Sequence, residues 1–93
     1  MKYVVKPSSR FAKDLKTVKK RGYDISLIED IIEKLADGEK LPQKNRDHAL
    51  SGDFAGCREC HITPDWLLVY KITDETMYLY LTRTGTHSDL FDK

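Results

Sequence analysis

Hydrophobic positions in the first part of the chain predict a short strand followed by an amphipathic helix. Residues 2–6 contain the run Tyr-Val-Val, which is typical of an extended segment, and Pro7 ends it. From 9 to 21, Phe11, Leu15 and Val18 recur at helical spacing while lysines occupy the other faces. Gly22 supplies a stop signal at the end of this helix.

A second helix is expected from about residue 26 to Gly38. Ser26 and Glu29 have the spacing of a capping box, which predicts the start of the helix. Its apolar stripe consists of Ile28, Ile31, Ile32 and Leu35. A polar connection containing Pro42 then follows over residues 39–47.

Beyond residue 47 the period of the hydrophobic pattern falls to about two, which indicates strands. We expect three consecutive strands at 56–63, 66–73 and 77–84, joined by short turns at 64–65 and 74–75. Residues 88–91 suffice for one helical turn after Gly85. The pattern therefore predicts an α+β fold, with two N-terminal helices packed on a mainly antiparallel four-stranded sheet and a short C-terminal helical turn.

The size of the chain predicts one domain over residues 1–93. A length of 93 residues and a hydrophobic content of 40% suit a single modest core. The first residues contain no apolar run long enough for a signal peptide or a membrane span, so we expect a cytoplasmic protein that does not engage a membrane.

Charge is distributed unevenly, although the net charge is only +1. Residues 1–22 carry eight Lys or Arg against the single acid Asp14, and residues 24–39 carry six acids against Lys34. A basic helix of this density attracts polyanions, and Lys13, Lys16 and Lys20 are its candidate substrate-binding residues. The alternative is a solvated helix face that keeps the protein soluble.

Cys57, Cys60 and His61 spell the c-type haem attachment pattern, which we interpret as coincidental. In an extended segment Cys57, Glu59 and His61 share one face while Cys60 points to the other, so the two sulfurs diverge. This divergence argues equally against a disulfide, and the ligands needed for zinc are scattered along the sequence. We therefore expect reduced thiols, no metal and no cofactor.

All three histidines, His48, His61 and His87, occur in the second half of the chain, interleaved with Asp65 and other candidate site residues. Imidazole titrates near neutrality, so several imidazoles beside an acid suit proton transfer around a charged substrate. Metal-free RNA cleavage needs a base for the 2′-hydroxyl, a cation for the phosphate and an acid for the leaving oxygen. The sequence contains candidates for each role.

Three further residues complete the candidate site. Arg83 would supply the cation, and Phe91 or Trp66 would stack on an unpaired base. Two of them have a structural alternative: Trp66 begins an apolar strand and suits the core, and Arg83 and Asp65 could be a structural ion pair or turn-former.

Three sequence blocks resemble the YafQ branch of the RelE/ParE toxin superfamily. They are D-H-A-L-S-G from Asp47, R-E-C-H-I-T-P-D-W-L-L-V-Y from Arg58, and R-T-G-T-H-S-D-L-F from Arg83. The resemblance implies a RelE-like fold and a bacterial type II toxin that enters the ribosomal A site and cuts translated mRNA without a metal. It places the functional positions at His48, His61, Asp65, His87 and Phe91, and Glu59 stands where relatives often have aspartate.

The resemblance also implies partners for the chain. A small antitoxin similar to DinJ or RelB would bind the toxin and repress its own promoter, so operator DNA would be reached only through the antitoxin. The ribosome and mRNA would be the targets. Two other functions remain open at this point: a ParE-like toxin that inhibits DNA gyrase without catalytic histidines, and a non-catalytic RNA-binding module that uses only the basic helix.

Overall fold

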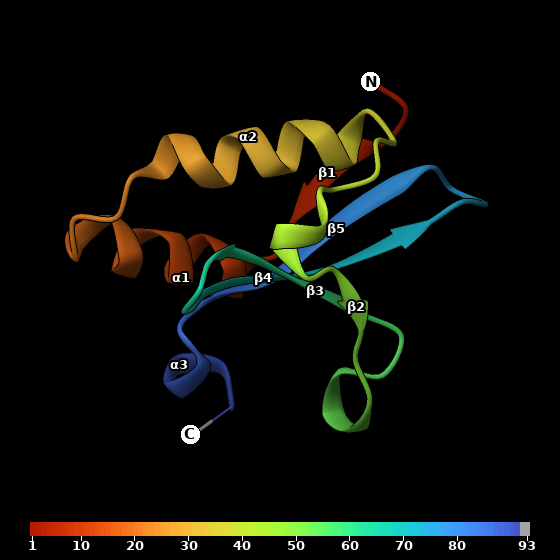
Figure 1. Cartoon of the computed structure of the whole chain (residues 1–93). Helices are drawn as coiled ribbons and strands as arrows, with labels where there is room; N and C mark the ends of the chain where they lie inside the picture. The colour runs from red at the N-terminus through yellow and green to blue at the C-terminus, as the bar shows by residue number, and fades with distance from the viewer. Residues whose placement is uncertain (92–93) are drawn as a thin grey trace.

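The computed structural model describes residues 1–91 as a sheet with helices on both faces (Figure 1). The strands are β1 (Val4–Pro7), β2 (His48–Ala49), β3 (Arg58–Thr63), β4 (Trp66–Thr73) and β5 (Tyr78–Gly85). The helices are α1 (Ser9–Lys20), α2 (Ile25–Ala36) and α3 (His87–Phe91), with single 3-10 turns at Gln43–Asn45 and Gly52–Phe54. The expected α+β fold is confirmed.

The sheet has five strands in the order β1-β5-β4-β3-β2, one more than the sequence predicted. The expected antiparallel meander of β3, β4 and β5 is present, and β1 joins it by parallel pairing, with Val4 opposite Tyr78. The additional strand is β2, which has only two residues. A strand this short has no period-two pattern, which is why the sequence did not reveal it.

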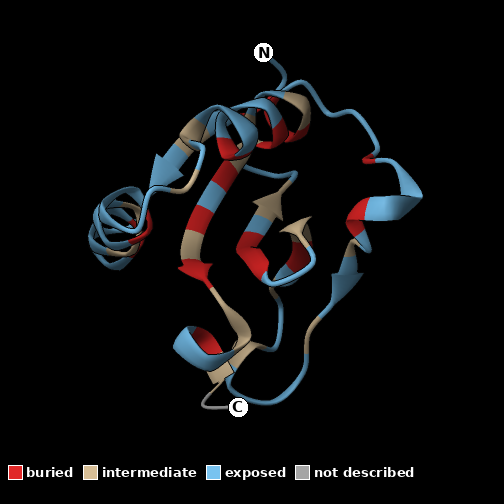
Figure 2. Cartoon of the chain, turned by 60° about the vertical axis from the view of Figure 1, so that its left-hand side comes forward, coloured by how far each residue is buried: buried red, intermediate tan, exposed pale blue. Residues whose placement is uncertain are grey.

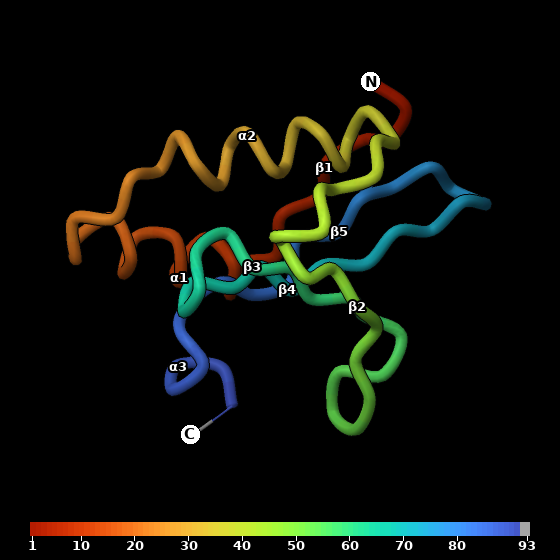
Figure 3. The backbone as a smooth tube through the Cα atoms, viewed as in Figure 1, coloured from red at the N-terminus to blue at the C-terminus, as the bar shows by residue number. Residues whose placement is uncertain are grey.

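Two apolar clusters lie on opposite faces of the sheet. The larger one joins α1 and α2 to the sheet through residues such as Phe11, Val18 and Ile28. The smaller one contains Leu67, Val69 and Leu90, so it lies between β4 and α3. The backbone tube in Figure 3 shows α1 and α2 on one side of the strands and α3 on the other. Because both faces are covered, β4 is buried over its first five residues. Figure 2 shows buried residues along the strands and on the inward-facing sides of the helices.

Side chains at the helix starts define where α1 and α2 begin. Ser8 caps α1 by accepting a hydrogen bond from the Phe11 amide at 2.9 Å. Asp24, not Ser26, caps α2, since its carboxylate accepts from the Ser26 amide at 3.1 Å. The capping box predicted at Ser26 is therefore wrong, and the helix begins at Ile25. No helix within residues 1–91 has the length and apolar character needed to cross a membrane.

The junction between β5 and α3 fixes the direction of the last helix. Gly85 has φ +154°, and a Cβ atom there would lie 2.9 Å from Cβ of Asp89. Asp89 accepts from the Thr86 amide at 2.9 Å and forms two hydrogen bonds with Arg21 at the end of α1. These contacts tie α3, which begins with His87, to the helix on the other side of the sheet.

Candidate active site

The pairing of β2 with β3 places His48 directly opposite Glu59. Glu59 is 5% exposed, and its Oε1 lies 3.7 Å from Nε2 of His48 and 3.3 Å from Nε2 of His61. His61 follows Glu59 by two residues on the same strand face, as alternation predicts. One buried carboxylate therefore faces two imidazoles that come from neighbouring strands.

The third imidazole comes from α3. The ring centroid of His87 is 5.6 Å from that of His61, and the His61 centroid is 6.4 Å from that of His48. The structure thus brings together the three rings that the sequence separates by up to 39 residues; we refer to His48, His61 and His87 as the histidine cluster. The cluster lies on the sheet face that carries α3, because Glu59 and His61 pair with Val69 and Leu67 of the smaller apolar cluster.

Asp65, in the turn between β3 and β4, orients His87. Its Oδ1 lies 2.5 Å from Nδ1 of His87 and 3.0 Å from the His87 amide nitrogen. Hydrogen bonds from the imidazole and the amide lower the pKa of Asp65 below its ordinary value, so the carboxylate is ionised at neutral pH. An ionised carboxylate only accepts, so Nδ1 of His87 carries the proton and Nε2 is left for other chemistry.

The segment before β2 attaches to the histidine cluster at two points. Asn45 is buried, and its side-chain amide donates to the His61 carbonyl at 2.7 Å. The carbonyl of Arg46 lies 2.7 Å from Nδ1 of His48, which must donate because a carbonyl only accepts. Asp47 accepts hydrogen bonds from Tyr70 at 2.7 Å and Arg58 at 3.1 Å, which secures the start of β2.

Sequence reasoning missed these three residues, Asn45, Arg46 and Asp47. The only available signal was their place directly before His48, at the end of the polar run over residues 39–47, which contains five ionisable side chains. That run was interpreted as a connection. The contact of this run with β3 depends on the 3-10 turn at Gln43–Asn45, which places the Asn45 side chain against the His61 carbonyl.

Arg83 and Trp66 lie elsewhere than the sequence suggested. Arg83 forms two hydrogen bonds with Asp14 of α1, at 2.7 and 3.2 Å, so its charge is already balanced and it is not a free cation beside the imidazoles. Trp66 is 2% exposed and donates to Thr84 at 2.9 Å. Its ring packs edge-on against Tyr23 in the core, so the stacking role considered for it is wrong: no face is available to a base.

Phe91 and the lysines of α1 occupy accessible positions. Phe91 is partly buried against the smaller apolar cluster, and its ring meets Phe54 edge-on at a centroid distance of 5.6 Å. It follows His87 by four positions on α3, so the two side chains share a helix face. The lysines considered for substrate binding are all exposed: Lys13, Lys16 and Lys20.

The two cysteines are free thiols on opposite faces of the sheet. Cys60 belongs to the larger apolar cluster, whereas Cys57 packs against the smaller one, as alternation predicted. Burial, with smaller contributions from the nearby acids Asp47 and Glu59, raises the pKa of Cys60 to about 12. The haem-like motif therefore has no pair of thiols presented together.

Glu59, His61 and His87 place one ligand atom each within 4.8 Å of one another. Such a set can bind a small divalent cation. The sequence analysis found only scattered ligand candidates, because these three residues converge through the sheet and α3 rather than through local spacing.

The arrangement suits proton transfer at an exposed edge. The histidine cluster lies beside a buried carboxylate, Glu59, and an exposed one, Asp65. Titratable groups that lie close together in different environments are typical of acid–base catalysis. The cluster is open to a large substrate, since His48 and Asp65 are exposed and His61 is partly exposed.

Comparisons with known proteins all find similarity to bacterial YafQ toxins. A sequence model of the family described as "Bacterial toxin of type II toxin-antitoxin system, YafQ" matches residues 3–92. The mRNA interferase toxin YafQ of Escherichia coli strain K12 is 39% identical over 85 residues, which are 90% of each protein.

Two solved structures have nearly the same fold. The E. coli DinJ–YafQ complex has a TM-score of 0.88 at 37% identity, covering 96% of this chain and 98% of that chain. The metal-bound toxin from Helicobacter pylori has a TM-score of 0.89 at 42% identity, covering 96% and 99%. The likeness therefore extends over almost the full length of both relatives.

Proposed function

Since the chain belongs to the YafQ family of bacterial type II toxin–antitoxin toxins, we propose that it is a ribosome-dependent endoribonuclease that cuts translated mRNA in the A site. The histidine cluster around Glu59 is the single observation that carries this proposal. A gyrase-binding toxin or a passive RNA-binding module has no need for three converging imidazoles with a carboxylate partner.

The reaction begins with attack of the 2′-hydroxyl oxygen on the adjacent phosphorus. A base removes the hydroxyl proton, the bond from phosphorus to the 5′-oxygen breaks, and an acid protonates that oxygen. The products are a 2′,3′-cyclic phosphate and a 5′-hydroxyl end. No metal is required, because imidazoles on both sides of the phosphate can take and return the protons.

His48, His61 and His87 share the proton transfers in this proposal. His87 offers Nε2, since Asp65 holds Nδ1. The Glu59 carboxylate stabilises the imidazole of His48 or His61 that carries a proton at Nε2, because its Oε1 lies 3.7 and 3.3 Å from these nitrogens. Arg83 acts through Asp14, by fixing the end of β5 from which His87 follows.

Phe91 and the basic face of α1 position the nucleic acid. Phe91 stacks on a base after moving off Phe54, and thereby aligns the 2′-oxygen. Lys13, Lys16 and Lys20 contact phosphates of the ribosome or the message. The protein partner is a DinJ-like antitoxin. The complex would bind operator DNA only through this antitoxin. The toxin acts in the cytoplasm.

In vitro translation of a defined mRNA followed by mapping of the cut ends tests the proposal. We expect cleavage within codons at the A site, 2′,3′-cyclic phosphate ends, and undiminished cutting by toxin that has been treated with EDTA and desalted before it is added to ribosomes in Mg²⁺ buffer. His87→Gln should remove cleavage while leaving the fold intact. Lys93→Gln, expressed and purified in the same way, is the control and should cleave at the wild-type rate. Cleavage of naked mRNA at the same rate, trapped gyrase complexes with normal translation, or full activity of the His87 variant would contradict the proposal.

A further inference from the structure

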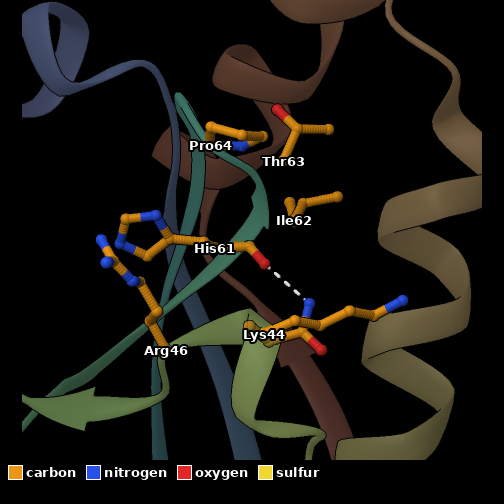
Figure 4. Close-up of a pocket in the computed structure, with 7 residues that line it drawn as sticks. Lys44, Arg46, His61, Ile62, Thr63 and Pro64 are labelled. Atoms are coloured by element: carbon orange, nitrogen blue, oxygen red, sulfur yellow. Dashed lines mark hydrogen bonds between the residues drawn. The ribbon is translucent and has the colours of Figure 1, made fainter.

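A cavity of about 510 Å³ opens beside His61 and is lined by residues 44–46 and 61–64 (Figure 4). Its volume falls within the roughly 300–1,000 Å³ of ordinary ligand pockets. Ile62 and Pro64 give it apolar walls, and Thr63 adds a hydroxyl. In Figure 4 the guanidinium of Arg46 lies next to the His61 imidazole, while Lys44 extends to the other side.

Arg46 differs in its charge balance from the other four arginines of the sequence. Arg10 and Arg83 pair with Asp14, Arg21 pairs with Asp89, and Arg58 pairs with Asp47. Within residues 1–91, Arg46 has no ion pair with a carboxylate closer than 4.0 Å. Its planar fork of donors is therefore available to a ligand, and phosphate is one of the two anions, with carboxylate, whose geometry this fork matches.

The backbone at Arg46 is held in an unusual conformation. Its φ is +48°, in the left-handed region that arginine rarely adopts. Three contacts enforce this geometry: the Arg46 amide donates to the Gln43 carbonyl at 3.0 Å, its carbonyl accepts from His48, and the neighbouring Asn45 donates to His61. Strained backbone of this kind concentrates at ligand-binding sites, where surrounding contacts sustain it.

From these observations we propose that Arg46 binds the phosphate next to the cleaved bond and that the adjoining cavity receives the nucleotide carrying that phosphate. This inference rests on the proposed function and adds to it a subsite outside the histidine cluster. The base lies against Ile62 and Pro64, and the guanidinium holds the flanking phosphate so that the scissile one faces His61. Lys44 adds a second positive charge at the rim.

Cleavage kinetics on programmed ribosomes test this role with three variants. Arg46→Gln should lower kcat/KM at least tenfold, mainly through KM, because a binding contact is lost while the imidazoles remain. Arg46→Lys should recover part of the loss, since it keeps the charge but not the fork. Lys40→Gln is the matched control: it also removes one exposed positive charge nearby, but Lys40 does not line this cavity, and kcat/KM should stay within twofold.

A fourth variant separates binding from folding. Glycine adopts positive φ without strain, so Arg46→Gly should keep the backbone that supports His48 and His61 and melt no lower than Arg46→Gln. It should nevertheless lose as much kcat/KM as Arg46→Gln. Full activity of Arg46→Gly would overturn the proposal.

Neutralising single phosphates of the message identifies the contact directly. One uncharged methylphosphonate, placed one position to either side of the cleaved bond, should reproduce the loss seen with Arg46→Gln at one of these positions. At that position the variant and the modified message should be non-additive, because both remove the same contact. Additive losses at both positions would overturn the inference.

Two other results are decisive. If wild-type protein cuts the message and Arg46→Gln cuts it equally well but loses affinity for the antitoxin, the cavity belongs to a protein partner and the inference is wrong. If wild-type protein leaves ribosome-bound mRNA intact, the proposed function is wrong, and the inference about Arg46 is wrong as well because it rests on that function.

Discussion

At the scale of single residues, the hydrogen bond from His87 to Asp65 determines which imidazole nitrogen is free. Asp65 accepts from Nδ1 and from the backbone amide, so both the tautomer and the ring orientation are fixed. Alternation along β3 was sufficient to predict that Glu59 and His61 share a face. The sequence pattern could not reveal the left-handed backbone of Arg46, because this conformation at a non-glycine residue depends on surrounding contacts.

Asp65→Asn tests the orienting role. The side-chain amide of asparagine can donate as well as accept, so the His87 tautomer is no longer enforced, and we expect cleavage to fall by about 10²-fold, as when an acid–base group is lost. Cleavage rates on programmed ribosomes measure this effect. Glu75→Gln, in the turn between β4 and β5, is the control, and wild-type rates for Asp65→Asn would remove Asp65 from the mechanism.

The two thiols should differ in reactivity. Burial raises the pKa of Cys60 to about 12, so the thiolate that reacts with alkylating agents is scarce in the folded protein, whereas Cys57 is only partly buried. Counting thiols with a chromogenic disulfide reagent should show one fast group in native protein and two in denaturant. Cys57→Ser should abolish the fast group, and two fast groups in native wild-type protein would contradict the burial of Cys60.

At the scale of elements, short pieces of structure carry much of the site. The helical stripes of α1 and α2 and the alternation of β3 to β5 were readable in the sequence because each continues for several residues. β2 and the 3-10 turn before it have two and three residues, too few for a period to emerge. These elements position His48, which explains why its neighbours Asn45 and Arg46 escaped prediction.

Gly85→Ala tests how closely α3 is packed against the end of β5. A Cβ atom would lie 2.9 Å from both Cβ and Oδ2 of Asp89, and φ +154° is strained for alanine. We expect a loss of about 1–3 kcal/mol in the free energy of unfolding, together with slower cleavage because His87 begins α3. Denaturant titration measures the first effect. Gly52→Ala, where φ is also positive but no atom lies within 4 Å, separates backbone strain from the clash.

At the scale of the whole molecule, two arginine–aspartate pairs bridge segments that are far apart in sequence. Arg21 reaches Asp89 from the end of α1, and Arg83 reaches Asp14 from β5. Separations of 68 and 69 residues place these pairs beyond any local pattern, so the pattern of a single sequence could not pair them. For the same reason Arg83 was expected at the site rather than at α1.

Acid should weaken the connection between α1 and α3. Hydrogen bonds from Arg21 and Thr86 hold the pKa of Asp89 well below its ordinary value, so the folded state favours the ionised carboxylate. The resulting stability is present above the unfolded pKa of about 4 and declines as pH falls below it. Denaturant titrations between pH 7 and 3 should show this decline. Asp89→Asn should show a smaller decline, and the control Asp53→Asn, at an exposed position in the 3-10 turn Gly52–Phe54, should match wild type.

The parallel pairing of β1 with β5 also governs when the molecule can assemble. Val4 of β1 pairs with Tyr78 of β5, so β1 has no neighbouring strand until β5 has been synthesised. His87 follows β5 directly and is made later still. A nascent chain therefore lacks both its completed sheet and its last imidazole through most of translation, so the histidine cluster can form only when synthesis is nearly complete.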